Sequence, residues 1–141
     1  MFTITAPYAA LLGLLFVLLS LKVIGVRRSA QIALGDGANP ELLRRTRVHA
    51  NFTEYVPIAL MLIALLEAQG KAAFAPLVHS VIVHTCCIAL LVGRCVHAYG
   101  VSQGTENLKF RVTGMLLTFT AIITSSSTIL VSLLLDVNPL G

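Results

Sequence analysis

Four long apolar segments constrain the fold of this chain more than any other feature. They cover about residues 5–26, 42–68, 73–99 and 108–135. A helix of about 20 apolar residues suffices to cross roughly 30 Å of hydrocarbon. Only 11% of the residues are charged, whereas a soluble domain carries about 25%, and the mean hydropathy is +0.89. We therefore expect an integral membrane protein, an all-α bundle of four helices that forms one domain over residues 1–141.

Basic residues gather at two of the three connections between these segments. The first basic group is Arg27, Arg28, Arg44, Arg45 and Arg47, the second is Arg94, Lys109 and Arg111, and the remaining connection has only Lys71. The positive-inside rule places both basic connections in the cytoplasm and both termini on the opposite side. The net charge is only +4, and without interleaved aromatic residues or a nucleic-acid-binding motif we expect no nucleic-acid partner. The first segment has no basic stretch before it and no small-residue cleavage site after it, which predicts a retained span.

The stretch from Arg44 to Pro57 carries the most informative polar residues. At about 100° per residue, Arg44, Arg47, Asn51 and Glu54 share one helix face, while Arg45 and His49 point elsewhere. Polar groups near hydrocarbon are costly, at roughly 2.5–3.5 kcal/mol each at a helix centre. Arg, Asn and Glu on one face can satisfy each other or hold a small zwitterionic ligand. The plainer interpretation is a set of cytoplasmic anchors with one intramembrane ion pair, such as Glu54 with Arg47 or Arg94.

Two prolines bear on the second segment. Asn39, Pro40 and Glu41 resemble a helix start, with Asn as the N-cap and Pro at the first helical position. Pro57 removes the backbone hydrogen bond to the carbonyl of Thr53 and bends a helix. We expect this bend to open a polar pocket beside Glu54.

Other reactive residue types have plainer interpretations. Cys86, Cys87 and Cys95 lie in one apolar segment, which favours buried thiols over a disulfide scaffold. His84 and Cys87 are three residues apart, but one such pair is weak support for a metal site, and we expect a bundle-facing, hydrogen-bonded histidine. The hydroxyl run 124–128 predicts a helix-packing face with weak interhelical hydrogen bonds.

Together these residues resemble a known family. Four spans, an Arg47-x-x-x-Asn51-x-x-Glu54-Tyr55-x-Pro57 run and a Gly93-Arg94-x-x-His97 run are similar to the MAPEG family, the membrane-associated proteins in eicosanoid and glutathione metabolism, and to its small bacterial members in particular. The resemblance covers essentially the whole chain. It implies an inner-membrane homotrimer of four-helix subunits, with one glutathione bound between each pair of neighbours near the cytoplasmic face.

The resemblance also implies roles for particular residues. Arg111 is the nearest match to the arginine that stabilises the glutathione thiolate, and we expect it to be the catalytic residue. The candidate glutathione-binding residues are Arg27, Arg44, Arg47, Asn51, Glu54, Tyr55, Arg94 and His97. Where catalytic mammalian members have a tyrosine, this chain has Val101, with Tyr99 two positions away, and Val112 replaces the serine of the prostaglandin synthase. Glutathione binding is therefore better supported than any one reaction.

The expected function is that of a glutathione transferase or peroxidase in which the thiolate attacks a lipophilic electrophile or peroxide arriving from the bilayer. The alternative is a non-catalytic lipid-binding or scaffold protein of the same architecture. A small transporter is disfavoured because no span is broken by a Gly/Pro pair at mid-membrane and no internal repeat is evident.

Overall fold

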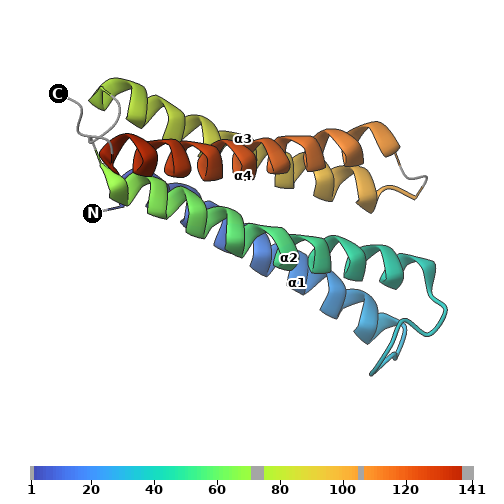
Figure 1. Ribbon diagram of the computed structural model, residues 1–141. Helices are drawn as coiled ribbons and strands as arrows, with labels where there is room; N and C mark the ends of the chain where they lie inside the picture. Colours follow the sequence, from blue (N-terminus) through green and yellow to red (C-terminus); the bar gives the residue numbers. More distant parts are fainter. Residues whose placement is uncertain (1, 71–74, 105–106, 138–141) are drawn as a thin grey trace.

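The fold is a bundle of four helices (Figure 1), which confirms the all-α prediction. The computed structural model describes residues 2–70, 75–104 and 107–137, with side chains described up to residue 135. The helices are α1 (Thr5–Ser29), α2 (Pro40–Gln69), α3 (Pro76–Ser102) and α4 (Leu108–Val137). All four are long and apolar enough to cross a membrane. The predicted turn residue Lys71 and the predicted start of the third span, Ala73, lie outside the described residues.

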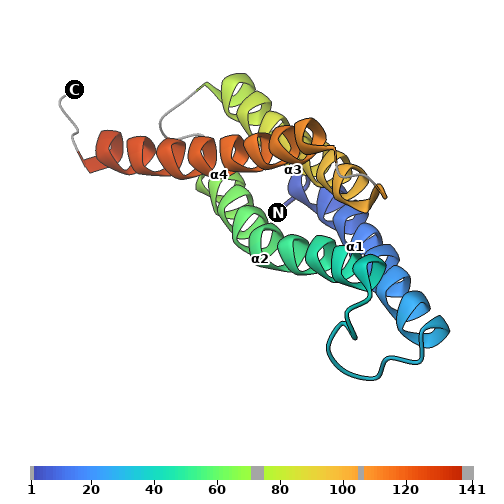
Figure 2. The same ribbon diagram turned by 90° about the vertical axis from the view of Figure 1, so that its right-hand side faces the viewer.

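The helices form two antiparallel pairs, α1 with α2 and α3 with α4 (Figure 1). One end of the bundle is called here the basic end. At this end α1 and α3 end, and α2 and α4 begin. Figure 1 shows the two pairs diverging toward this end, and Figure 2 views the bundle with this end facing the reader. The connections of the two basic residue groups therefore lie on one side of the bundle, as the charge pattern predicted, while the side of the membrane they face stays a prediction.

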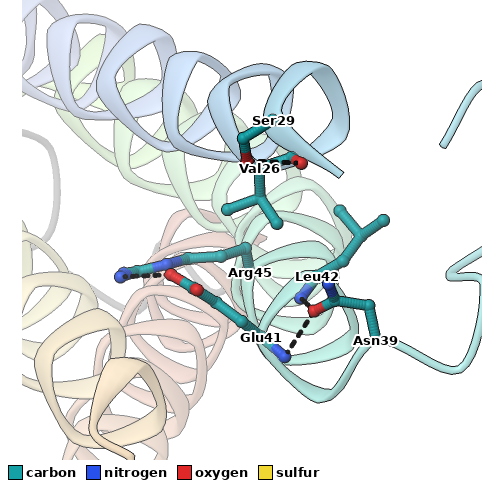
Figure 3. A network of polar contacts seen from close by, with 6 residues as sticks. All are labelled: Val26, Ser29, Asn39, Glu41, Leu42 and Arg45. Carbon is teal, nitrogen blue, oxygen red and sulfur yellow. Dashed lines mark hydrogen bonds and ion pairs between the residues drawn. The ribbon is translucent and has the colours of Figure 1, made fainter. Parts of the chain in front are cut away.

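The start of α2 follows the sequence prediction closely. The Asn39 side-chain oxygen accepts hydrogen bonds from the backbone N–H groups of Glu41 and Leu42, both at 3.0 Å, and Pro40 is the first helical residue (Figure 3). The amide oxygen satisfies two of the backbone donors that a helix start leaves unpaired. This cap fixes where α2 begins and therefore the register of the arginines that follow.

Glycines allow α3 and α4 to pack closely near the basic end. A Cβ on Gly114 would lie 2.6 Å from the carbonyl oxygen of Gly93 and 2.7 Å from the backbone nitrogen of His97, and a Cβ on Gly100 would lie 2.7 Å from the Cβ of Phe110. The third span was predicted to end at about residue 99, but α3 continues to Ser102. Gly100 therefore serves as a close-contact position inside the helix.

A carboxylate caps α1 at the opposite end of the bundle. The two oxygens of Glu67, near the end of α2, accept hydrogen bonds from the backbone N–H groups of Ile4 and Thr5, each at 2.8 Å. A negative charge at a helix N-terminus also interacts favourably with the helix dipole. One acidic side chain thus ties α1 to α2 at this end.

The side chains facing outward are largely apolar. Leu14, Leu116 and Leu134 are at least 60% exposed, whereas Leu12, Ile63 and Leu90 are buried between the helices. In a soluble protein such exposure would be a liability. In a protein of four apolar spans the exposed faces suit contact with lipid or with further copies of the chain.

Two groups of small residues differ in part from their predicted environments. Cys86 and Cys87 are buried, but Cys95 is exposed, so the prediction of three buried thiols is wrong for Cys95. Within the hydroxyl run, the Oγ atoms of Ser125 and Thr128 donate to carbonyls four residues earlier in α4, both at 2.7 Å, rather than to another helix. This back-bonding satisfies the hydroxyls locally.

His84 is hydrogen-bonded, although it does not face the bundle interior. Its Nδ1 lies 3.1 Å from the hydroxyl of Tyr8, and the two rings meet edge to face with centroids 5.9 Å apart. The His84 side chain is exposed. This contact joins α1 to α3.

Candidate functional site

A pocket lined mainly by polar and basic residues lies between α2, α3 and α4 at the basic end. Its cavity volume is about 260 Å³. The lining residues, called here the arginine pocket, are Leu43, Arg44, Arg47, Asn51, His97, Val101 and Arg111. Five of the nine predicted site residues therefore line one cavity, and none of the lining residues that the structure describes is acidic.

Helix periodicity explains which α2 residues line the pocket. Arg44, Arg47 and Asn51 are spaced by three and four residues, so they stack on successive turns of one face. Arg45 is about 200° from Arg47 around the helix, and it lines a different pocket. His49 also points away, with its Nε2 3.0 Å from the hydroxyl of Ser20. The prediction that Arg44, Arg47 and Asn51 share one helix face, while Arg45 and His49 point elsewhere, is therefore confirmed.

Two of the pocket arginines, Arg44 and Arg47, have guanidinium groups without a partner among the described residues. Neither Arg44 nor Arg47 makes a side-chain hydrogen bond or ion pair with any residue in the described part of the chain. Guanidinium groups bind carboxylates in a two-point geometry that is stronger than neutral hydrogen bonding. The pocket therefore presents positive charge and donors suited to an anionic ligand.

Arg94 lies behind the pocket and is only 1% exposed. Its Nη1 donates to the side-chain oxygen of Asn51 at 2.7 Å, and its Nη2 donates to the carbonyl of Gly114 at 3.3 Å and contacts the sulfur of Met115 at 3.5 Å. Its guanidinium carbon is 5.9 Å from the ring centre of Tyr55. Arg94 thus links α3 to both α2 and α4.

The contact with Arg94 fixes the orientation of the Asn51 amide. Arginine only donates hydrogen bonds, so the amide oxygen of Asn51 must face it. The amide nitrogen of Asn51 has no partner among the residues the structure describes. Asn51 can therefore offer two N–H donors to a carbonyl or carboxylate of a ligand in the pocket.

Besides Arg94, three predicted site residues do not line the arginine pocket. Tyr55 packs against Phe119 of α4, with ring centroids 5.6 Å apart, which closes α2 against α4 one turn beyond Asn51. Glu54 is exposed and makes no hydrogen bond or ion pair with another described residue. Arg27 donates to the carbonyl of Gly35 at 2.9 Å and lines a separate surface depression.

The predicted position of the pocket is corrected by this arrangement. Pro57 lies inside α2, as expected, but neither it nor Glu54 lines the arginine pocket, which ends on α2 at Asn51. The physical reason is the divergence of the two helix pairs, which creates space at the basic end. Closer to the middle of the bundle, the contact between Tyr55 and Phe119 fills that space.

A second pocket at the basic end was not predicted from the sequence. Its cavity volume is about 400 Å³, and it lies between α1 and α3 with one residue from α2. Its lining residues, called here the leucine groove, are Leu15, Leu18, Leu19, Lys22, Arg45, Cys95, Ala98, Tyr99, Ser102 and Gln103. The available signal was the position of Lys22 near the end of the first apolar segment, and of Arg45 on a different face of the second segment from Arg47.

The fold and this site define an integral membrane protein with four helices and a basic pocket at one end. The family model of the MAPEG family matches residues 5–131. Two relatives named inner membrane protein YecN, from Escherichia coli strains K12 and O6:H1, are each 35% identical over 120 residues, which cover 85% of this chain and 85% of the relative. The chain therefore belongs to the MAPEG family, as the sequence resemblance predicted.

Proposed function

We propose that the arginine pocket binds glutathione and that the protein uses the glutathione thiolate to attack lipophilic electrophiles or peroxides. The observation that carries this proposal is the gathering of three guanidinium groups, the Asn51 amide and His97 around one cavity. Glutathione carries two carboxylates, one ammonium and two amide bonds. Arginine side chains and the Asn51 amide suit those carboxylates and carbonyls.

The size of the cavity supports a binding site shared between subunits. Its volume of about 260 Å³ is slightly below the ~300–1,000 Å³ usual for small-molecule sites. A tripeptide bound there would extend past the rim of a single chain. In the proposed homotrimer, Arg27 and Glu54, which do not reach the pocket of their own chain, contribute to the site of a neighbouring subunit. Chemical cross-linking in detergent tests this assembly, and a chain that runs only as a monomer contradicts it.

Arg111 is the proposed catalytic residue. A thiol such as that of glutathione has a pKa near 8.5 when free, and an opposite charge within ~4–6 Å lowers a pKa by 1–3 units. The guanidinium of Arg111, which lines the pocket, would thus favour release of the thiol proton to solvent. With an aryl halide, the sulfur forms a bond to the ring carbon and the halide ion leaves with the electron pair of the broken bond.

The test combines binding and turnover in purified protein. Glutathione should raise the melting temperature, because a ligand that binds only the folded state stabilises it. Arg111→Ala should lose conjugation of an electrophilic aryl halide while keeping glutathione binding, and Lys109→Ala, two residues earlier and outside the pocket, should keep both. Unchanged turnover in Arg111→Ala would remove Arg111 from this role. Binding without turnover in the unmodified protein would favour the non-catalytic alternative.

The membrane environment agrees with this class of substrate. Four apolar helices and an inner-membrane relative support an integral inner membrane protein. A lipophilic electrophile would reach the pocket laterally from the bilayer, whereas glutathione would enter from the water at the basic end. Both reactants can therefore meet at the same depth.

A further inference from the structure

The leucine groove is larger than the arginine pocket and takes no part in the proposed glutathione site. It is about 400 Å³ in volume, against about 260 Å³ for the arginine pocket. Among the residues that the structure describes, the two pockets share no lining residue. A ligand of the leucine groove therefore does not compete with glutathione for the same lining residues.

The groove changes from apolar to cationic along α1. Leu15, Leu18 and Leu19 form its wall, and Lys22 follows one turn later toward the basic end. From Leu15 to Lys22 the helix rises about 10 Å, since each residue adds 1.5 Å. Arg45 of α2 lines the same groove. An apolar wall that leads to two cations over this distance matches a fatty acyl chain attached to an anionic headgroup.

We propose that the leucine groove binds an anionic phospholipid, with an acyl chain along the leucines and the headgroup phosphate at Lys22 and Arg45. Phosphate interacts with arginine through paired hydrogen bonds and with lysine as a point charge. Tyr99, which is 58% exposed, lines the same groove. Tyrosine is enriched at the level of lipid headgroups because its ring is apolar and its hydroxyl is polar.

Charge distinguishes a lipid from a second copy of the chain as the occupant. Copies inserted in one membrane in the same orientation place their basic ends side by side. Among the described residues at this end, arginines and lysines greatly outnumber the acidic residues. Asp36 and Glu41 are two of these acidic residues. A neighbouring copy would bring like charges to Lys22 and Arg45, whereas an anionic headgroup brings the opposite charge.

Glu41 weakens the positive charge of the groove. One of its carboxylate oxygens lies 3.5 Å from Nη2 of Arg45, and Figure 3 shows the two side chains running alongside each other, away from the Asn39 cap. The Glu41 side chain is 53% exposed, so it competes with a headgroup from the solvent side. Removing this carboxylate should therefore strengthen lipid binding, an effect opposite to that of a misfolded variant.

The experiment is native mass spectrometry of the full chain in detergent, titrated with phosphatidylglycerol or with phosphatidylcholine of identical acyl chains. The equilibrium constant for retention of phosphatidylglycerol by the unmodified protein should be about tenfold larger than that for phosphatidylcholine. Lys22→Gln with Arg45→Gln should abolish that preference, and Glu41→Gln should increase it. Arg28→Gln with Lys109→Gln removes the same charge outside the groove and should leave the preference intact.

Three results would overturn the proposal. The first is equal retention of the two lipids by the unmodified protein. The second is displacement of phosphatidylglycerol by millimolar inorganic phosphate, which would make the site one for a soluble anion. The third uses the exposed Cys95, which lines the groove: oxidative cross-linking of two chains through Cys95, unaffected by added phosphatidylglycerol, would show that a second copy fills it. Protection of Cys95 from a maleimide by phosphatidylglycerol supports the proposal.

Discussion

The arginine pocket and the leucine groove lie at the same end of one bundle, yet they have opposite characters. Three arginines, an asparagine and a histidine line the first, whereas leucines and two separated cations line the second. The difference follows from α2, whose neighbouring arginines face opposite ways: Arg45 toward the leucine groove and Arg47 toward the arginine pocket. A dense run of basic residues on one helix can therefore serve two separate surfaces.

The two pockets also differ in how they are supported. Behind the arginine pocket lies the buried Arg94, and the close approach of α3 to α4 at Gly114 holds it in place. In the described part of the chain the leucine groove has no comparable buried polar link, and α1 contributes leucine side chains to its wall. The arginine pocket should therefore be far more sensitive to changes in the packing of α3 against α4 than the leucine groove.

The largest expected effect is that of Gly114→Ala. The added methyl would lie 2.6 Å from the carbonyl oxygen of Gly93, so α3 and α4 must move apart, and overpacking of this kind costs about 1–3 kcal/mol. We expect a lower melting temperature and loss of glutathione binding, measured by thermal shift and titration. Gly13→Ala is the matched control, because a Cβ there meets nothing within 4 Å. Equal effects of the two substitutions would contradict the proposed helix contact.

Arg94→Met should have the next largest effect. The substitution removes a donor to Asn51 and to Gly114, and hydrogen bonds to charged groups contribute about 1.5–3 kcal/mol. The freed Asn51 amide no longer has a fixed orientation, so glutathione affinity should fall by at least about tenfold. Phosphatidylglycerol retention should stay within about twofold of the unmodified protein. A parallel loss of both ligands would show that the two pockets are not independent.

The smallest effects come from the paired substitutions Arg47→Ala and Arg45→Ala. Arg47→Ala should weaken glutathione binding by about fivefold, since an exposed ion pair contributes up to about 1 kcal/mol, and should leave lipid retention unchanged. Arg45→Ala should do the reverse. Each variant serves as the control for the other, because both remove one arginine from the same turn of α2. If either variant affects both ligands equally, the assignment of these arginines to separate pockets is wrong.

The sequence was sufficient for features that depend on local spacing. The four spans, the Asn39 cap and the shared face of Arg44, Arg47 and Asn51 follow from composition, cap chemistry and helix periodicity. The family is also evident from the motifs. All of these depend on residues that are close together in the chain.

Features that depend on packing between helices could not be predicted from local spacing in the sequence. The exclusion of Glu54 from the pocket follows from the contact between Tyr55 and Phe119, which are far apart in sequence. The extension of α3 through Gly100 follows from its contact with Phe110 of α4. The leucine groove combines α1 with α3, and nothing in either segment alone marks that pairing.

The most direct test of the central claim is an equilibrium titration of the purified protein with glutathione, repeated for Arg47→Ala and Arg28→Ala. The claim is that the residues lining the arginine pocket hold the tripeptide. We predict saturable binding to the unmodified protein, binding about fivefold weaker in Arg47→Ala, and unchanged binding in Arg28→Ala, which lies outside the pocket. No binding to the unmodified protein, or the same affinity in all three, would contradict the account.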